Sequence, residues 1–155
     1  MTKTNAMRLL DIADIAYSTH EYDTVDGQID GVHVAEKLGI DPMRVYKTLI
    51  TVGKGTGHFV FVIPVSCELD LRKAAAAAGE KYVEMIRLKE LEPLTGYVHG
   101  GCSPIGMKRA LPTFIEETAE LFQTIVVSAG RVGFQVELSP LDLAQAIDAR
   151  FADLV

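Results

Sequence analysis

The stretch from Thr95 to Gly106 brings glycine, histidine, cysteine, serine and proline together in an otherwise apolar part of the chain. Its sequence is Thr-Gly-Tyr-Val-His-Gly-Gly-Cys-Ser-Pro-Ile-Gly. Backbone that must approach a ligand closely needs residues without a β-carbon, and Pro104 narrows the dihedral angles beside it. The pattern does not match an ordinary hairpin turn. It therefore predicts a loop that belongs to a binding or catalytic site.

Lys47 is a second candidate, because it lies in a run that predicts a β-strand, Val-Tyr-Lys-Thr-Leu-Ile at 45–50. Side chains alternate between the two faces of a strand, so Lys47 would point away from Tyr46 and Thr48. A lysine that points into the concave side of a sheet is costly unless it meets an anion or a carboxylate. Binding of negative charge is the functional hypothesis, and an exposed strand lysine is the alternative that the pattern leaves open.

The sequence offers little support for a nucleophile of the protein's own. Gly101-Cys102-Ser103-Pro104 is not the GxSxG turn of a serine hydrolase, so we expect a structural role for Ser103. Cys102 could act as a nucleophile if backbone amides or Lys108 lowered its pKa, and otherwise lines or packs the loop. Cys67 follows an apolar strand and is expected to be a small buried residue.

Metal and phosphate sites are also not indicated. None of the four histidines has metal-ligand spacing, which predicts no bound metal; they are His20, His33, His58 and His99. The glycine cluster at 53–57 could be misread as a phosphate loop. Such a loop opens a helix, whereas here a strand-like segment follows, so the cluster predicts a hairpin. We expect no cofactor.

Composition limits the class of protein. The chain has 155 residues, is 48% hydrophobic and carries a net charge of −6, which fits one domain over residues 1–155. Its acidity argues against autonomous binding of DNA or another long nucleic acid, because phosphate contacts need excess Lys and Arg. No apolar run reaches the ~18 residues of a membrane span, and residues 1–6 lack an apolar leader segment. We expect a soluble, cytoplasmic protein with two free thiols and no membrane partner.

Hydrophobic patterns and helix boundary residues predict an α+β fold, because strands cluster instead of strictly alternating with helices. The predicted helices span 5–13, 31–38, the alanine-rich segment after Asp70, and the segment that begins at Ser139-Pro140. The predicted strands span 15–22, 45–52, 58–65, 82–85, 108–115, 124–128 and 134–138, with a turn at 129–133. The strands are expected to form a mixed, curved sheet or barrel with helices outside it.

Six segments, in the same order along nearly the whole chain, resemble the YbaK family of aminoacyl-tRNA deacylases, which belongs with the editing domains associated with prolyl-tRNA synthetase. They are Val-His-Val-Ala-Glu-Lys-Leu-Gly at 32–39, Val-Tyr-Lys-Thr-Leu at 45–49, Leu-Asp-Leu-Arg-Lys at 69–73, Lys-Tyr-Val-Glu-Met at 81–85, the loop at 95–106, and Val-Ser-Ala-Gly-Arg at 127–131. The resemblance implies the mixed barrel-like fold. It also implies hydrolysis of Cys-tRNA(Pro), and of Cys-tRNA(Cys) as a further substrate, in trans to prolyl-tRNA synthetase.

The resemblance assigns a set of site residues. It implies that Lys47 is catalytic, that Gly100 and Gly101 offer backbone amides to the ester oxygen, and that the acceptor end of the tRNA is bound nearby. The implied substrate-binding residues are Tyr22, Thr48, Ser103, Pro104 and Ser128.

The family chemistry that this implies needs no protein nucleophile, because the cysteinyl thiol of the substrate attacks its own ester carbonyl. Two positions depart from the family pattern: Asp30 stands where an aromatic residue is frequent, and Gln135 where an aspartate is frequent. These departures leave the amino-acid preference open. The alternatives are a deacylase for another small amino acid, such as alanine, that activates water, and a non-catalytic module that binds a synthetase or a nucleotide.

Overall fold

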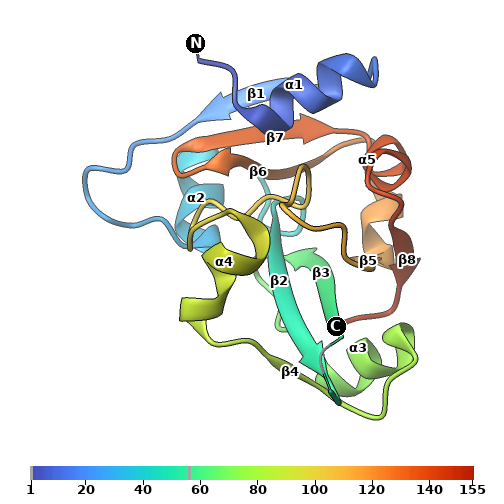
Figure 1. The fold of residues 1–155 in the computed structure, drawn as a ribbon. Coiled ribbons are helices and arrows are strands. Elements are labelled where there is room, and N and C mark those ends of the chain that lie inside the picture. The colour runs from blue at the N-terminus through green and yellow to red at the C-terminus, as the bar shows by residue number, and fades with distance from the viewer. Residues whose placement is uncertain (1, 56) are drawn as a thin grey trace.

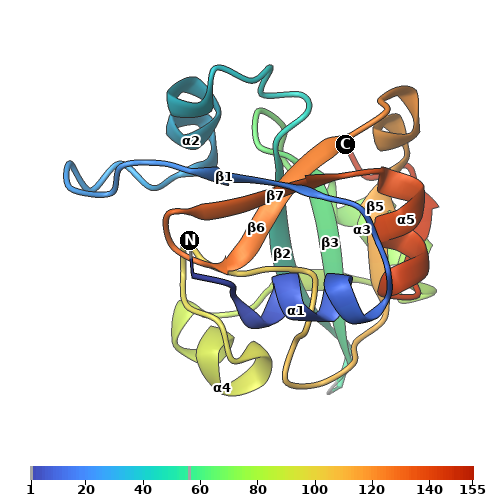
Figure 2. The same ribbon diagram turned by 90° about the horizontal axis from the view of Figure 1, so that it is seen from above.

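The computed structural model describes residues 2–55 and 57–155, and it is an α+β protein built on two sheets (Figures 1 and 2). One sheet has the strand order β1-β7-β6 and the other has the order β4-β2-β3-β5-β8. The strands are β1 (Ser18–Glu21), β2 (Tyr46–Gly53), β3 (His58–Pro64), β4 (Val83–Met85), β5 (Thr113–Glu116), β6 (Ile125–Arg131), β7 (Phe134–Leu138) and β8 (Arg150–Ala152). The α-helices are α1 (Asn5–Ile12), α2 (Gly31–Leu38), α3 (Leu71–Ala78), α4 (Leu91–Thr95) and α5 (Pro140–Ala146), and 3₁₀ turns occupy Leu88–Glu90 and Glu117–Leu121.

Local boundary signals define most of the helices. The Asp70 carboxylate accepts hydrogen bonds from the N–H groups of Arg72 and Lys73, and α3 ends at Gly79, which adopts the left-handed conformation with φ of 70°. Helix α2 ends in the same way at Gly39. Ser139 accepts a hydrogen bond from the Asp142 N–H at the start of α5. The sequence-based predictions of these helices are confirmed.

The larger sheet is mixed, as predicted. Strands β2 and β3 form an antiparallel hairpin in which Tyr46 pairs with Pro64 and Val52 with His58, while β3–β5 and β5–β8 are parallel pairs. Thr56, which belongs to the glycine cluster predicted as a hairpin turn at 53–57, lies outside the described residues. The two sheets meet at a parallel bridge between Val45 and Val126. The α+β class is confirmed, with the strands arranged as two joined sheets.

Three predicted segments differ from the structure. Strand β1 begins only at Ser18, because the Ile15 N–H donates to the Leu10 carbonyl and completes the end of α1. The segment 108–112 is irregular and only Thr113–Glu116 forms a strand. Strand β6 continues to Arg131, past the predicted start of the turn, with an irregular register between Ser128 and Arg131.

The main core lies between the two sheets and under α1 and α5. Its buried members include Met7 and Leu10 of α1, Ile50 of β2, Val127 of β6 and Leu143 of α5. A second cluster, around Phe61 and Ile63, packs the opposite face of the larger sheet against α3. Figure 2 shows the strands between α2 on one side and α5 on the other. Among the described residues, no helix is both long and apolar enough to cross a membrane.

Candidate functional site

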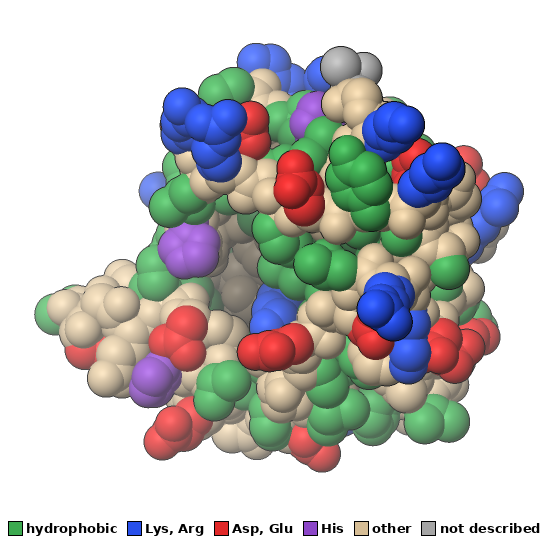
Figure 3. Space-filling view, turned by 90° about the horizontal axis from the view of Figure 1, so that it is seen from below, with side chains coloured by type: hydrophobic (Ala, Val, Ile, Leu, Met, Phe, Trp, Pro, Cys, Tyr) green, Lys and Arg blue, Asp and Glu red, His purple; other side chains and the backbone are tan. Residues whose placement is uncertain are grey.

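A cavity of about 500 Å³ lies where the two sheets diverge beyond the Val45–Val126 bridge. Strand β4 pairs with β2 only from Thr51 to Gly53, so it leaves the first half of β2 uncovered. The cavity is lined by Tyr22, Ile29, Asp30, Gly31, Val32, Val34, Val45, Tyr46, Lys47, Thr48, Leu49, Val65, Leu91, His99, Gly100, Cys102, Ser128 and Gln135. Figure 3 shows a hollow in one face of the molecule with a basic side chain inside it and a histidine beside it.

Lys47 lines this cavity from β2 and is partly buried. Its neighbour Tyr46 packs into the main core, whereas Leu49 contacts the cluster around Phe61, so the two faces of β2 alternate as expected. Among the described residues, the Lys47 ammonium has no hydrogen-bond or ion-pair partner. A partly buried ammonium without a protein partner is suited to contact a negatively charged or electron-rich ligand group.

Neutral polar groups also line the cavity. The hydroxyls of Tyr22 and Thr48 are buried and lack a hydrogen-bond partner within the described part of the chain, and both residues line the cavity. A buried hydroxyl that pairs with nothing costs about 1–3 kcal/mol, so both groups favour a polar ligand. Ser128 and Gln135 pair across β6 and β7 and are 9% and 5% exposed. The Ser128 hydroxyl accepts a hydrogen bond from the Gly130 N–H at 3.1 Å.

The glycine loop contributes Gly100 to the cavity. Gly100 has a φ of 86°, and a β-carbon at this position would lie 2.7 Å from Cδ1 of Ile29. Its N–H has no hydrogen-bond partner in residues 2–55 and 57–155. Glycine is therefore required here for both backbone conformation and space, and its amide is available to an oxyanion.

Three other loop residues that the resemblance assigned to the site, Gly101, Ser103 and Pro104, do not line the cavity. Gly101 is buried, and its N–H donates to the Val98 carbonyl at 3.0 Å, so this amide already closes a turn. Ser103 is fully buried and its hydroxyl accepts from the Ile105 N–H at 3.1 Å. Pro104 is also buried. The structure thus gives Gly101, Ser103 and Pro104 positions behind the cavity wall, where they shape the loop that presents Gly100.

Cys102 lines the cavity, but its environment opposes reactivity. Burial raises the pKa of the Cys102 thiol to about 12. A thiol with this pKa stays protonated at neutral pH, whereas a nucleophilic cysteine needs its thiolate form. The expectation that Cys102 packs the loop instead of acting as a nucleophile agrees with this environment. Cys67 is partly buried beside Met43 and lies outside the cavity.

The charged groups at the cavity edge are few. Asp30 precedes α2 and its carboxylate hydrogen bonds with His33, which holds the pKa of Asp30 below its ordinary value. His99 lines the cavity from the glycine loop and is exposed. In the part of the chain that the structure describes, no group of three or more His, Cys, Asp and Glu side chains could hold a metal ion.

Several cavity residues carry no sequence signal of their own. Ile29 lies in a segment without secondary structure, and Leu91 begins a helix, α4, that was not predicted. Val32 and Val34 lie in the predicted helix over 31–38. Each is apolar and reaches the cavity only because α2, α4 and the glycine loop converge there. Gln135 stood out in the sequence as a departure from a family pattern, and the structure places it in the cavity.

The fold of two joined sheets is that of an aminoacyl-tRNA editing domain. Residues 30–146 match the family model of the aminoacyl-tRNA editing domain, and the chain belongs to this family. A relative from Enterococcus faecalis, described as a candidate Cys-tRNA(Pro)/Cys-tRNA(Cys) deacylase, EbsC, is 47% identical over 152 residues, covering 98% of this chain and 93% of that protein. YwhH of Bacillus subtilis, an uncharacterized protein, is 25% identical over 125 residues, which cover 81% of this chain and 78% of YwhH. The family resemblance noted in the sequence is confirmed.

Solved structures show the same fold. A hypothetical protein, APE2540, superposes with a TM-score of 0.86 at 23% identity, over 95% of this chain and 96% of its own. A candidate trans-editing enzyme for prolyl tRNA synthetase superposes with a TM-score of 0.82 at 21% identity, over 99% and 98% of the two chains. At such low identity, these matches support the architecture alone.

Proposed function

We propose that this protein is a trans-editing aminoacyl-tRNA deacylase, one domain over residues 1–155, that hydrolyses Cys-tRNA(Pro). Membership of the editing-domain family and the 47% identical relative support this activity. The same relative supports Cys-tRNA(Cys) as a further substrate. The proposed setting is the cytoplasm, where charged tRNA and its synthetases meet.

One observation carries the assignment to a cysteinyl substrate: the cavity has a polar binding surface but no activated nucleophile among the described residues. Lys47 and the Gly100 N–H are free to bind the ester, while the pKa of Cys102 is raised to about 12. A site that positions an ester without attacking it suits a substrate that carries its own nucleophile. The cysteinyl thiol is such a group.

The proposed reaction has two steps. The substrate sulfur attacks the ester carbonyl carbon and the bond from that carbon to the ribose oxygen breaks, so the thiol proton ends on the released 3′-hydroxyl. The amino acid leaves as a cyclic thioester, which water then opens to free cysteine. The Gly100 N–H would stabilise the developing oxyanion, and the Lys47 ammonium would bind a ribose or terminal phosphate oxygen.

Tyr22, Thr48, Ser128 and Gln135 would hold the aminoacyl group in the folded pose that attack requires. An indirect role is proposed for Gly101, Ser103 and Pro104, which would fix the conformation of the loop from outside the cavity. Gln135 offers a neutral amide oxygen to the substrate amine where a carboxylate would offer a charge.

An alanine-specific enzyme is the alternative, and it would have to activate water. Asp30 is the carboxylate that lines the cavity, and its hydrogen bond with His33 holds its pKa low, which makes it a weak base. The low pKa of Asp30 therefore argues against this carboxylate as the base that an alanine-specific enzyme would need.

Deacylation of tRNA(Pro) charged with cysteine, alanine or serine tests this proposal with the purified protein. We expect rapid release of cysteine and slow release of alanine and serine. Equal rates with alanine and cysteine would exclude the substrate-thiol mechanism. Lack of any activity, with the protein folded, would favour a non-catalytic binding module.

A further inference from the structure

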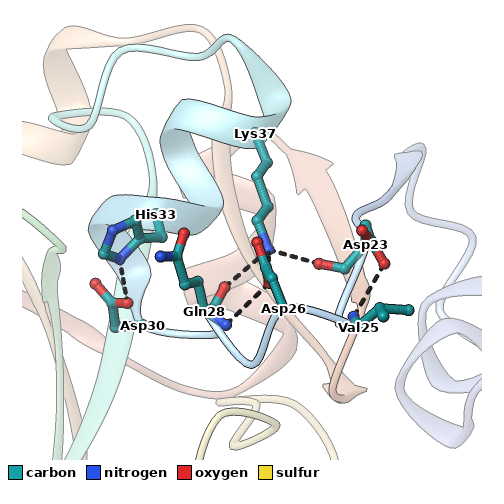
Figure 4. Close-up of polar contacts among 7 residues, drawn as sticks. All are labelled: Asp23, Val25, Asp26, Gln28, Asp30, His33 and Lys37. Carbon is teal, nitrogen blue, oxygen red and sulfur yellow. Dashed lines mark hydrogen bonds and ion pairs between the residues drawn. The ribbon is translucent and has the colours of Figure 1, made fainter.

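Lys37, near the end of α2, makes an unusual set of contacts with the segment that follows β1. Its ammonium donates to the Asp23 carbonyl at 2.6 Å, to Oδ1 of Asp26 at 2.8 Å and to the Gln28 carbonyl at 3.0 Å (Figure 4). An ammonium has three N–H donors, so these three acceptors use its whole capacity. The Lys37 side chain is only 20% exposed, which distinguishes it from an ordinary surface lysine.

The segment from Asp23 to Gln28 has little else to hold it. Within the described residues, its other hydrogen bonds are internal, such as those from the Val25 N–H to Asp23 and from the Gln28 N–H to Asp26. The Val25 side chain, in the middle of this segment, is 93% exposed, so it adds little packing. Among the described residues, Lys37 therefore supplies the hydrogen bonds that tie this segment to the body of the protein.

Both ends of the segment reach the cavity. Tyr22 precedes it, and the Lys37 ammonium lies 5.9 Å from the centre of the Tyr22 ring, within the range of a cation–π contact. Ile29 follows it, and the Ile29 side chain covers the face of Gly100 where a β-carbon would stand. A displacement of the segment would thus move two parts of the cavity wall, at Tyr22 and at Ile29.

We propose that Lys37 is a positioning residue for substrate recognition: its ammonium fixes residues 22–30 and, through them, the Tyr22 and Ile29 walls of the cavity. This inference rests on the proposed deacylase function. The three acceptors converge on one nitrogen, a geometry that an ammonium satisfies and a planar guanidinium does not. Two of the acceptors are backbone carbonyls, so the contact depends on Lys37 more than on the side chains of the segment.

The decisive variant is Lys37→Met, which keeps an unbranched side chain and removes the ammonium. In the wild type, opening of this segment must break the three Lys37 hydrogen bonds. Without them the free energy of local opening is lower, so we expect amide hydrogen exchange within residues 23–29 to accelerate at least about 10-fold. We expect the KM for Cys-tRNA(Pro) to rise about 10-fold and kcat to fall as well, because the displaced Tyr22 wall both binds the aminoacyl group and holds it in the pose that attack requires. Lys37→Arg should resemble Lys37→Met.

Lys81→Met is the control. It makes the same charge change at an exposed lysine away from the cavity, and it should leave both the hydrogen exchange of residues 23–29 and the kinetics as in the wild type.

The outcomes separate the two proposals. A purely structural role for Lys37 would lower the folded fraction and leave KM and the exchange of this segment unchanged, which would overturn the positioning role. Faster exchange with an unchanged KM would overturn it as well, because the segment would then not be part of the recognition surface. Wild-type protein without deacylase activity would refute the proposed function alone, and the exchange comparison would still decide whether Lys37 orders the cavity wall.

Discussion

Val45 of the segment before β2 and Val126 of β6 form a parallel bridge that joins the two sheets. The Val126 N–H donates to the Arg44 carbonyl at 2.9 Å, which supports the same junction. Two residues farther along each strand lie Lys47 and Ser128, both in the cavity wall. Because the pairing is parallel, equal steps along the two strands lead in the same direction. A shift of register at this bridge would therefore separate the two site residues.

Lys47→Ala should lower deacylation of Cys-tRNA(Pro) by at least about 100-fold with little change in melting temperature, because the variant loses a charged contact to the reacting group. Lys47→Arg should not restore full activity, since a forked guanidinium does not replace a compact ammonium. Single-turnover deacylation measures both effects. Lys81→Ala is the matched control and should turn over normally. Wild-type rates in Lys47→Ala would remove this residue from the mechanism.

Gly100→Ala should reduce activity per folded molecule by roughly 10- to 1,000-fold, because the added methyl group collides with Ile29 and displaces the amide that faces the ester. Some stability should also be lost at the positive φ of 86°. Gly79→Ala is the control, since Gly79 has a φ of 70° and no atom within 4 Å of an added β-carbon. It should cost about 1 kcal/mol of stability and leave activity intact. A destabilised but fully active Gly100→Ala would show that the loop only permits a turn.

Cys102→Ser tests whether the reacting sulfur belongs to the enzyme or to the cysteinyl substrate. With the pKa of Cys102 raised to about 12 by burial, the enzyme thiol is neutral across the physiological range, so we expect the variant to keep most of its activity. The seryl ester of tRNA(Pro) should turn over poorly in either protein, because a hydroxyl is a far weaker nucleophile than a thiol. Complete loss of activity in folded Cys102→Ser would point instead to an enzyme nucleophile.

Glu137 connects the strands around the sheet junction, and its removal should be visible in stability. Its carboxylate accepts from Thr124, binds His20 at 2.8 Å and pairs with Arg44 at 2.9 Å, contacts that lower the pKa of Glu137. Glu137→Gln should lower the free energy of unfolding at pH 7 by about 2 kcal/mol, the scale of hydrogen bonds to a charged group.

The pH dependence of that difference follows from the sign of the shift. A depressed folded pKa means that the stabilisation by Glu137 is complete above the unfolded pKa of about 4.3 and is lost as the pH falls through the folded pKa. Urea unfolding of wild type and Glu137→Gln between pH 7 and pH 3 should therefore show curves that converge at low pH. Glu84→Gln, at an exposed position, should change little at any pH. A constant difference down to pH 3 would contradict the electrostatic account.

The isolated protein should hydrolyse Cys-tRNA(Pro) and Cys-tRNA(Cys) at similar rates. Its net charge of −6 leaves few residues for phosphate contacts along the tRNA body, so selectivity for the proline acceptor should come from prolyl-tRNA synthetase. Competition between the two charged tRNAs, with and without the synthetase, measures this. A large preference by the protein alone would show that it reads the tRNA itself.

The sequence alone determined the features that depend on neighbouring residues. Helix α3 runs between a capping aspartate and a left-handed glycine, and the β2–β3 hairpin follows from two strand-like runs joined by glycines, because caps and tight turns are satisfied within a few residues. The same local patterns singled out Lys47 and the glycine loop as candidates. Only comparison of several segments in order suggested an editing domain.

The tertiary structure decided which candidates share a site. Lys47, Ser128 and Gly100 lie far apart in the chain, and the parallel bridge and the packing of Ile29 on Gly100 bring them to one cavity. The sequence could not show that the Gly101 amide is already used by Val98, nor that the Lys37 ammonium meets three acceptors from another segment. Such contacts depend on where distant backbone atoms fall after packing. Local propensity carries no information about them.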